Sequence, residues 1–488
     1  MTQLSTNSVI AKIMGIIVLI EGIAMIVPWI WAEGAGETES AFAFRICVPL
    51  TLLIGILVSL CFRSGRTDFG VREGYIVVAL AWIIASIIGM FPYMLSGTTE
   101  DLSSAFFESA AGFTTTGCTC VDSDKMSHSL LLWKALSNWL GGMGILVFVI
   151  SILPALGVSG QFIVRAETPG PVYEKTTVRI KNSTRGLYIT YISFTLMAFV
   201  LLLLSDKVCL YDSIILSLGS VSTGGVSIHS EGLAFYDSVY VETVVSFFCF
   251  LASVNFIMYY NLISGNISRI IKDIELKTFF AVIAIGTILC AIGMLLNTDI
   301  SLTEAVRESL FQVVNVSSTS GYTKNVTFGW PTACQFVLLT LMIIGGCSAS
   351  TAGSLKVVRL LVALKLIGRG VIRRIHPRSV VAVKLGGESV SAPIVSAISV
   401  FIMAYFGLIF LSVIVLSIQG LDAETNITTT IAMISNTGAA FTHHICIGNF
   451  SMFNAGSKFF LSLIMITGRL ELFTIIVFFT RTFWGRKR

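Results

Sequence analysis

Apolar stretches long enough to cross a lipid bilayer recur along the whole chain, and this feature confines it to a helical membrane fold. About 20 apolar residues suffice for a membrane helix. Only 12% of the 488 residues are charged, whereas an average soluble domain carries about 25%. We therefore predict ten membrane stretches, the eighth of them interrupted: 10–31, 44–62, 75–96, 129–153, 187–205, 238–263, 278–297, 332–366, 390–417 and 457–480.

The first stretch has no convincing small-residue cleavage site, so we expect a membrane helix there and not a secretion signal. Glu21 within it is expected to face other helices and not lipid. Lys and Arg are concentrated in alternate loops, most densely from Lys356 to Lys384. The positive-inside rule then places both termini in the cytoplasm of a protein that crosses the membrane several times. The net charge of +5 reflects this orientation and requires no nucleic-acid partner.

Four short polar segments, each containing a glycine after three small polar or glycine residues, interrupt the hydrophobic pattern at regular intervals. They are Thr114–Thr119, Ser222–Ser227, Ser318–Thr323 and Ser435–Ala440. The moderately apolar runs before them, 103–114, 211–222, 307–318 and 424–435, are too short to span a membrane and suit re-entrant helices. We expect Ser104, Asp212 and Thr425 to cap these helices, and Glu308 to lie in a first turn.

The sequence therefore predicts an all-α membrane protein with four pseudo-repeated helix–pore-loop–helix units around one central pore. The predicted parts are an extra N-terminal helix pair, 1–70, and four units, 71–160, 161–270, 271–385 with a broken inner helix, and 386–488. Non-helical backbone at membrane depth is tolerated only where it is buried in protein or lines water. Four such loops around one axis meet this requirement and can offer main-chain carbonyls to a dehydrated cation. Ordinary Ser/Thr/Gly loops between helices would explain one such segment more easily than four.

Several motifs resemble the superfamily of Trk, Ktr and HKT potassium transporters, and most closely the membrane subunit of bacterial Trk uptake systems. Besides the four loops they are 112–117, 139–144, 166–171, 345–353 with Lys356, 376–378 and 468–470, in the family's order and spacing over nearly the whole chain. The resemblance implies a four-unit pore in the bacterial inner (plasma) membrane, a homodimer and a cytoplasmic, nucleotide-binding regulatory subunit of the TrkA type. It also implies that potassium binds main-chain carbonyls at Thr115, Thr116, Gly117, Thr223, Gly224, Gly225, Thr319, Ser320, Gly321, Asn436, Thr437 and Gly438.

The first of these glycines bears on selectivity. Family members that prefer sodium commonly have a serine there, so Gly117 favours potassium. Val226 and Ala439 stand where the family often has phenylalanine or another residue, and Cys118 stands where Ser or Ala is usual. These departures leave the carbonyl arrangement possible but allow looser selectivity.

A run of ten small residues, Gly345–Ser354, lies inside the eighth stretch and should break its helix. Tight helix packing is the alternative, but we expect an intramembrane loop below the third filter segment that acts as a gate and includes Gly345, Gly346 and Gly353. Arg469 lies within the last stretch. It is expected to face the pore below the filter, with a buried ion pair as the alternative.

Several other residues and segments have simpler expected roles. Glu108 is expected to support the filter and not to bind ions, and residues 139–144 to allow close helix packing. The basic stretch from Arg369 to Arg378 could dock acidic lipid or the regulatory subunit. His443 and His444 are expected in a solvated outer loop.

Potassium uptake through this filter is the predicted function, and a symporter coupled to H⁺ or Na⁺ is the main alternative. The chain contains no HExxH, no GxSxG and no paired membrane aspartates, so a membrane enzyme is not expected, and a non-conducting scaffold is a further alternative. It also contains no Walker loop and no strand followed by GxGxxG, so no organic cofactor is expected and potassium is the only ligand. A disulfide among Cys118, Cys120, Cys209 and Cys446 is an open but less favoured possibility.

Overall fold

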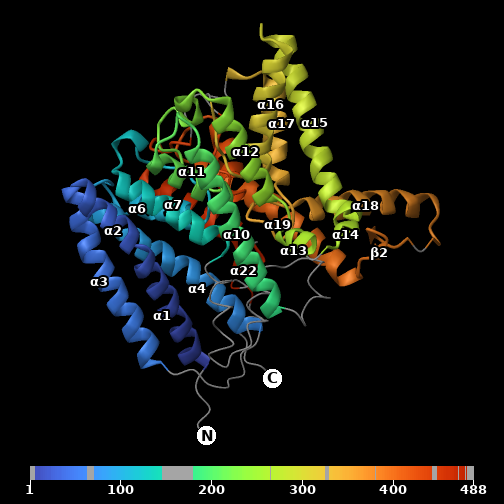
Figure 1. The fold of residues 1–488 in the computed structure, drawn as a ribbon. Coiled ribbons are helices and arrows are strands. Elements are labelled where there is room, and N and C mark those ends of the chain that lie inside the picture. Colours follow the sequence, from blue (N-terminus) through green and yellow to red (C-terminus); the bar gives the residue numbers. More distant parts are fainter. Residues whose placement is uncertain are drawn as a thin grey trace.

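The computed structural model describes residues 6–62, 71–144, 180–263, 265–324, 329–379, 381–441, 448–470, 472–476, 478 and 480. The described part is all-α except for one two-stranded hairpin, β1 (Lys384–Leu385) with β2 (Glu388–Ser389). Figure 1 shows the N-terminal helices at one side, the yellow and orange helices between residues 274 and 344 at the other, and the C-terminal helices in the centre. The predicted all-α membrane fold is confirmed.

The N-terminal group and the first unit are composed of α1 (Thr6–Ala24), α2 (Ile26–Ala35), α3 (Thr38–Cys61), α4 (Val71–Gly89), α5 (Phe91–Leu95), α6 (Leu102–Phe113), the short 3₁₀ helix η1 (Ser123–Lys125) and α7 (His128–Gly142). The second unit contains α10 (Ile180–Leu203), α11 (Leu210–Ser222), η4 (Gly232–Tyr236), α12 (Val239–Ser253), α13 (Phe256–Ile263) and α14 (Ile267–Lys272).

The third unit contains α15 (Ile274–Asn297), α16 (Leu302–Ser317), α17 (Thr332–Ile344), α18 (Val357–Ile375) and the hairpin. The fourth contains α19 (Ala392–Ser417), α20 (Ala423–Ile434), α21 (Ala455–Arg469) and α22 (Phe473–Ile476). Each unit thus has a long helix, a short helix, a loop and a second helix, while the exact unit boundaries given above stay a prediction.

Six described helices are long and apolar enough to cross a membrane: Asn7–Ala35, Thr38–Cys61, Arg72–Leu95, Gly186–Leu203, Ile274–Asn297 and Ala392–Ser417. The second helices of the units are shorter. α7, α12 and α21 have 15 residues each and α17 has 13. A 15-residue helix is about 22 Å long, less than the roughly 30 Å of hydrocarbon. All four therefore stop before they could span the bilayer alone.

The predicted stretch 238–263 is not one straight helix, because α12 and α13 form a pair bent by 90°. The break is stabilised locally, since the Asn255 side chain accepts a hydrogen bond from the Ile257 amide (2.9 Å). The freed carbonyls of Ala252 and Ser253 accept hydrogen bonds from Thr351 and Cys347 of another unit. The sequence of residues 238–263 alone does not indicate this break, because the hydrogen-bond donors come from a distant part of the chain.

The short helices begin earlier than predicted. Their N-caps are Asp101, Cys209, Ser301 and Asp422. Ser104, Asp212 and Thr425 instead occupy the third helical position, where Thr425 donates through its amide to Asp422 (2.9 Å). α16 begins at Leu302, so Glu308 lies in its second turn and not in its first.

The N-terminal helices α1 and α3 pack closely through small residues. A Cβ on Gly55 would lie 2.7 Å from the Leu19 amide nitrogen, and one on Gly15 would lie 2.8 Å from that of Ser59. α1 also packs on α4, which contacts α6. Glu21 is buried and directed at α4, with Oε1 3.1 Å from where a Cβ on Gly89 would lie. It thus faces other helices as expected.

Candidate filter and gate

The four loops after the short helices have the same backbone conformation. Each begins with a residue in the left-handed region, namely Thr115, Thr223, Thr319 and Asn436, with φ between 54° and 58°. Two residues later each has a glycine with positive φ, namely Gly117, Gly225, Gly321 and Gly438. Non-glycine residues adopt positive φ rarely, so four occurrences at equivalent positions indicate one structural unit used four times.

Each loop is anchored to the helix before it in the same way. The amide of the residue before the filter glycine donates to a carbonyl five residues earlier. The four bonds are Thr116 to Ala111 (3.0 Å), Gly224 to Gly219 (2.9 Å), Ser320 to Asn315 (3.0 Å) and Thr437 to Ala432 (2.9 Å). These hydrogen bonds turn each loop back on the helix that precedes it. They pair the amide of the residue before the filter glycine, while the carbonyl of that residue stays available to other partners.

The four glycines close the loops into a ring. A Cβ on Gly117 would lie 1.6 Å from the Gly224 carbonyl oxygen, and one on Gly225 would lie 1.7 Å from that of Ser320. The contacts continue from Gly321 to the Thr437 oxygen (1.9 Å) and from Gly438 back to the Thr116 oxygen (2.0 Å). Each loop thus contacts the next and the fourth contacts the first. At each of the four positions a larger residue would force the neighbouring backbone to shift.

A pocket opens at this ring and is lined by all four loops, through Thr116, Gly117, Gly225, Ser320, Gly321, Thr437 and Gly438 among others. The C-terminal ends of α6, α11, α16 and α20 lead directly into the loops. A helix C-terminus carries about half a negative charge. Four carbonyls and four helix ends therefore favour a cation at this place.

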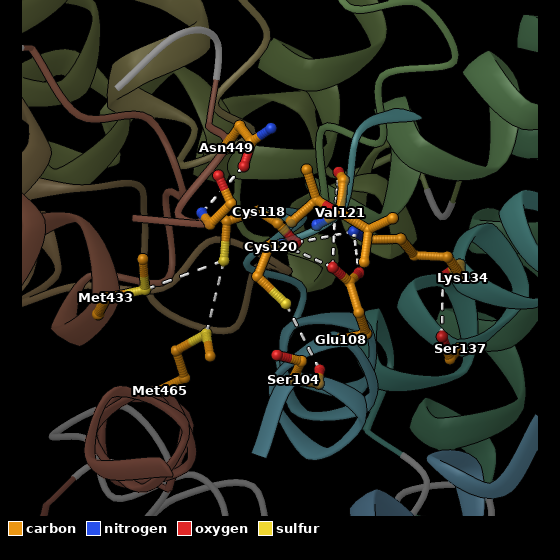
Figure 2. Close-up of polar contacts among 12 residues, drawn as sticks. Ser104, Glu108, Cys118, Cys120, Val121, Lys134, Ser137, Met433, Asn449 and Met465 are labelled. Carbon is orange, nitrogen blue, oxygen red and sulfur yellow. Dashed lines mark hydrogen bonds and ion pairs between the residues drawn. The ribbon is translucent and has the colours of Figure 1, made fainter. Parts of the chain in front are cut away.

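A buried ion pair braces the first loop from behind (Figure 2). The Lys134 ammonium lies 2.7 Å from Glu108 Oε2 and donates to the Cys118 carbonyl (2.8 Å). Glu108 Oε1 accepts hydrogen bonds from the Cys120 amide and the Thr119 hydroxyl, both at 2.6 Å. Glu108 supports the segment after the filter, as expected. Lys134, which the sequence alone does not single out, is buried in α7.

The segment after the third loop has a similar brace. The Lys324 ammonium lies 2.6 Å from Glu242 of α12 and 2.9 Å from Glu308 of α16. Burial lowers the pKa of Lys324, but the bonds to the two carboxylates outweigh it, so the pKa is raised and the side chain stays charged. This brace joins the second unit to the third.

Residues 345–356 form a loop between α17 and α18 that lies directly against the filter loops. The Gly353 amide donates to the Thr319 hydroxyl (2.8 Å), and the Thr351 and Thr223 hydroxyls are 3.2 Å apart. A Cβ on Gly353 would lie 2.3 Å from the Ser435 carbonyl oxygen. The loop therefore contacts the second, third and fourth units where their filter loops begin.

Two side chains hold this loop from other elements. Arg469 donates to the carbonyls of Thr351 (2.7 Å), Gly141 (2.8 Å) and Gly142 (2.9 Å). Glu275, at the start of α15, accepts hydrogen bonds from the amide and the hydroxyl of Ser348, both at 2.6 Å. Arg469 thus links the loop to the end of α7, and Glu275 links it to α15.

The expected tight packing at residues 139–144 is present. A Cβ on Gly141 would lie 1.8 Å from the Phe113 carbonyl oxygen, and one on Gly142 would lie 2.9 Å from the Ser222 Cβ. Asn138, which the sequence analysis missed, fills the space behind Gly224 with its Cγ 2.7 Å from where a Cβ would lie. In the sequence, the only indication of its role is its position about one helical turn before Gly141 and Gly142.

Among the described residues the cysteines are free thiols, so the considered disulfides among Cys118, Cys120 and Cys209 are not formed. Cys446, His443, His444, the 166–171 motif and Glu471 lie outside the described residues.

Helical membrane proteins in which four equivalent loops close into a ring of carbonyls form one class of cation-transporting proteins. The family model named TrkH, described as "Cation transport protein", matches residues 41–485. The chain belongs to this TrkH family. The family consists of transport proteins, in agreement with the prediction that the chain is not an enzyme.

Individual relatives match over almost their full length. The Trk system potassium uptake protein TrkH of Escherichia coli K12 is 32% identical over 484 residues, covering 97% of this chain and 99% of the relative. The Trk system potassium uptake protein TrkG of the same organism is 30% identical, covering 98% of each chain. The crystal structure of the potassium transporter TrkH from Vibrio parahaemolyticus matches with a TM-score of 0.87 and 27% identity, covering 98% of this chain and 100% of that one.

Proposed function

We propose that this chain takes up potassium across the inner membrane by conduction through the ring of four loops. The closed sequence of contacts from Gly117 through Gly225, Gly321 and Gly438 back to Thr116 supports this proposal most directly. The names of the relatives, which are potassium uptake proteins, point to the same ion.

Chemically, the ring would replace the water around a potassium ion with main-chain oxygens. The oxygens belong to the twelve residues named above, from Thr115–Gly117, Thr223–Gly225, Thr319–Gly321 and Asn436–Gly438. Because the loops are held by bonds to their own helices and by contacts with each other, the oxygens are in place before the ion arrives. The helix ends behind them add a favourable field.

In this proposal the loop of residues 345–356 is the gate, and Arg469 keeps it closed. The loop lies at the foot of the filter loops, and the Arg469 guanidinium holds it through the Thr351 carbonyl. The hydrogen bonds to three carbonyls offset the cost of placing the Arg469 charge at membrane depth. These charge-assisted bonds can break together when the loop moves. Gly345, Gly346 and Gly353 permit the tight turns: Gly345 has φ of 71°.

The proposed assembly is a homodimer with a cytoplasmic, nucleotide-binding regulatory subunit of the TrkA type. α18 extends away from the other helices in Figure 1. Its apolar stripe is exposed, with Leu364 at 55% and Ile375 at 67%, and its last turn holds Arg373 and Arg374. The stripe suits a second copy of the chain, while the arginines suit acidic lipid headgroups or the regulatory subunit.

A measurement of reversal potential separates conduction from coupled transport. Purified protein in planar bilayers is placed under a potassium gradient, and pH and sodium gradients are then added. For conduction, the potential shifts by about 59 mV per tenfold change in potassium and ignores the other two gradients. A shift with pH or sodium would instead support the symporter coupled to H⁺ or Na⁺.

A further inference from the structure

Three sulfur atoms meet directly behind the first filter loop (Figure 2). Cys118 Sγ lies 3.9 Å from Met433 Sδ and 3.8 Å from Met465 Sδ. Cys118 follows the filter glycine Gly117, Met433 is in α20 and Met465 is in α21. All three residues are buried. Three separate segments therefore bring one thiol and two thioethers together in one place.

These ligands and their spacing fit a soft metal ion. Thiolate and thioether ligands select Cu(I), whereas oxygen ligands suit hard cations. A metal bonded to sulfur at about 2.3 Å, the length of a zinc–thiolate bond, separates three coplanar sulfur ligands by about 4 Å. The distances from Cys118 Sγ to the sulfur atoms of Met433 and Met465, 3.9 and 3.8 Å, are close to this value. We propose that Cys118, Met433 and Met465 form a binding site for a soft monovalent cation, Cu(I) or Ag(I).

Binding involves no electron transfer. The cation replaces the proton of the Cys118 thiol, the proton leaves to water, and the two methionine sulfurs each contribute a lone pair. The filter pocket provides a route of access, because Cys118 lines it together with Gly117 and Gly438. Potassium, which prefers oxygen, stays with the carbonyls. The two ions thus share an entrance but not a site.

The site is connected to the fourth filter loop. The Met433 carbonyl accepts from the Asn436 amide (3.2 Å), and the Met465 carbonyl accepts from the Asn436 side chain (2.9 Å). The same side-chain amide donates to the Thr116 hydroxyl (3.1 Å). A metal that draws the three sulfurs together therefore acts on both the first and the fourth loop. Resting here on the proposed function, we expect a bound soft cation to block potassium conduction.

The first test measures binding and does not depend on transport. Full-length protein is purified with the exposed Cys61 and Cys209, and also Cys446, replaced by serine. Silver nitrate is titrated in chloride-free buffer, and bound silver is counted by mass spectrometry after dialysis. We expect Cys118→Ser to hold one silver ion fewer per chain than this parent protein, or to hold it about 10- to 100-fold or more weakly. Met465→Leu and Met433→Leu should weaken the binding of the same ion.

Cys120→Ser is the matched control. Cys120 is also buried but directs its thiol to the Ser104 carbonyl, 3.5 Å away (Figure 2). It should bind silver like the parent protein. Equal affinity in Cys118→Ser and the parent would overturn the proposal. So would methionine variants that bind as tightly as the parent, since silver would then be held by a thiol alone. Cys118→Ala replaces Cys118→Ser if that variant does not elute as a single species.

The second test measures potassium flux into liposomes with and without silver, each variant normalised to its own silver-free rate. We expect silver to stop flux in the parent and in Cys120→Ser, and Cys118→Ser to resist it. If silver binds as described but flux continues, the inhibitory consequence is wrong while the site stands. A parent that carries no potassium even without silver would count against the proposed function and leave the binding result intact.

Discussion

At the residue scale, the buried pair of Glu108 and Lys134 shows how side chains hold a filter loop without touching the ion. Lys134 also binds the Cys118 carbonyl, and Glu108 binds two donors of the following segment. Both side chains of the pair therefore bind the segment just after Gly117. Removing one partner from such a pair leaves a buried charge unpaired, which costs more than the pair itself contributes.

We predict that Lys134→Met or Glu108→Gln alone destabilises the protein by about 3–5 kcal/mol and lowers potassium flux, because each leaves one buried partner uncompensated. The double variant should lose less than the sum of the two. Thermal unfolding in detergent and liposome flux measure these effects. The exposed pair Arg45–Glu33 is the matched control, and Glu33→Gln should change little. Additive losses in the double variant would contradict a coupled pair.

At the element scale, the loop of residues 345–356 and the breaks of the second helices depend on each other. α12 ends at Ser253, and its last carbonyls bind Cys347 and Thr351 of the loop. α7 ends at Gly142, and its last carbonyls bind Arg469. The last carbonyls of each shortened helix therefore accept hydrogen bonds from the loop or from Arg469. The ends of α7 and α12 and the loop thus stabilise one another.

We predict that Arg469→Ala raises potassium flux. Each charge-assisted bond is worth about 1.5–3 kcal/mol, so losing even one shifts the loop equilibrium by about tenfold or more. Flux in liposomes without the regulatory subunit measures the effect, and Arg469→Lys, which keeps the charge but not the planar fork, should fall between. A fall in flux in a well-folded Arg469→Ala protein would show that the arginine is only structural.

We predict that weakening the hydrogen bonds between Ser348 and Glu275 also raises potassium flux. Glu275→Gln keeps one acceptor for Ser348 but loses the charge, so we expect a rise in flux of a few-fold, and Glu275→Ala should raise it further. Glu304→Gln, at an exposed position in the first turn of α16, is the control. Single-channel recording would show a higher open fraction. Unchanged gating in both Glu275 variants would exclude Glu275 from the gate.

Much of this element pattern was predictable, because it depends on local sequence. The four short helices, the break before Gly345 and the close packing at Gly141 follow from composition and repetition. The break at Ser253 was not predictable, since its carbonyls are satisfied by residues about a hundred positions away. The same holds for Lys134, which counts as an ordinary charge until Glu108 is placed beside it. Long-range partners, and not local preference, decide these cases.

At the scale of the whole molecule, α18 exposes a stripe of apolar side chains. Leu364, Ile367, Val371 and Ile375 are all more than half exposed. The helix is not among those that could span a membrane. A second copy of the chain is the occupant that we propose for this surface.

We predict that Ile367→Glu together with Val371→Glu converts the proposed dimer to a monomer, because like charges would then face each other across the interface. Mass photometry in detergent measures the state. Ile288→Gln, an exposed position on α15 away from this stripe, is the control. A dimer that survives the α18 double substitution would place the interface elsewhere.

The central claim is that four loops share one ring through which potassium passes, and single substitutions of its glycines test it most directly. Gly117→Ala, Gly225→Ala, Gly321→Ala and Gly438→Ala each place a Cβ within 2.0 Å of a neighbouring carbonyl oxygen. Gly407→Ala, in open space on α19, is the control. We expect all four ring variants to elute as folded protein yet lose potassium flux or its selectivity over sodium, with Gly407→Ala unchanged. Full, potassium-selective flux in any one of the four would contradict the account.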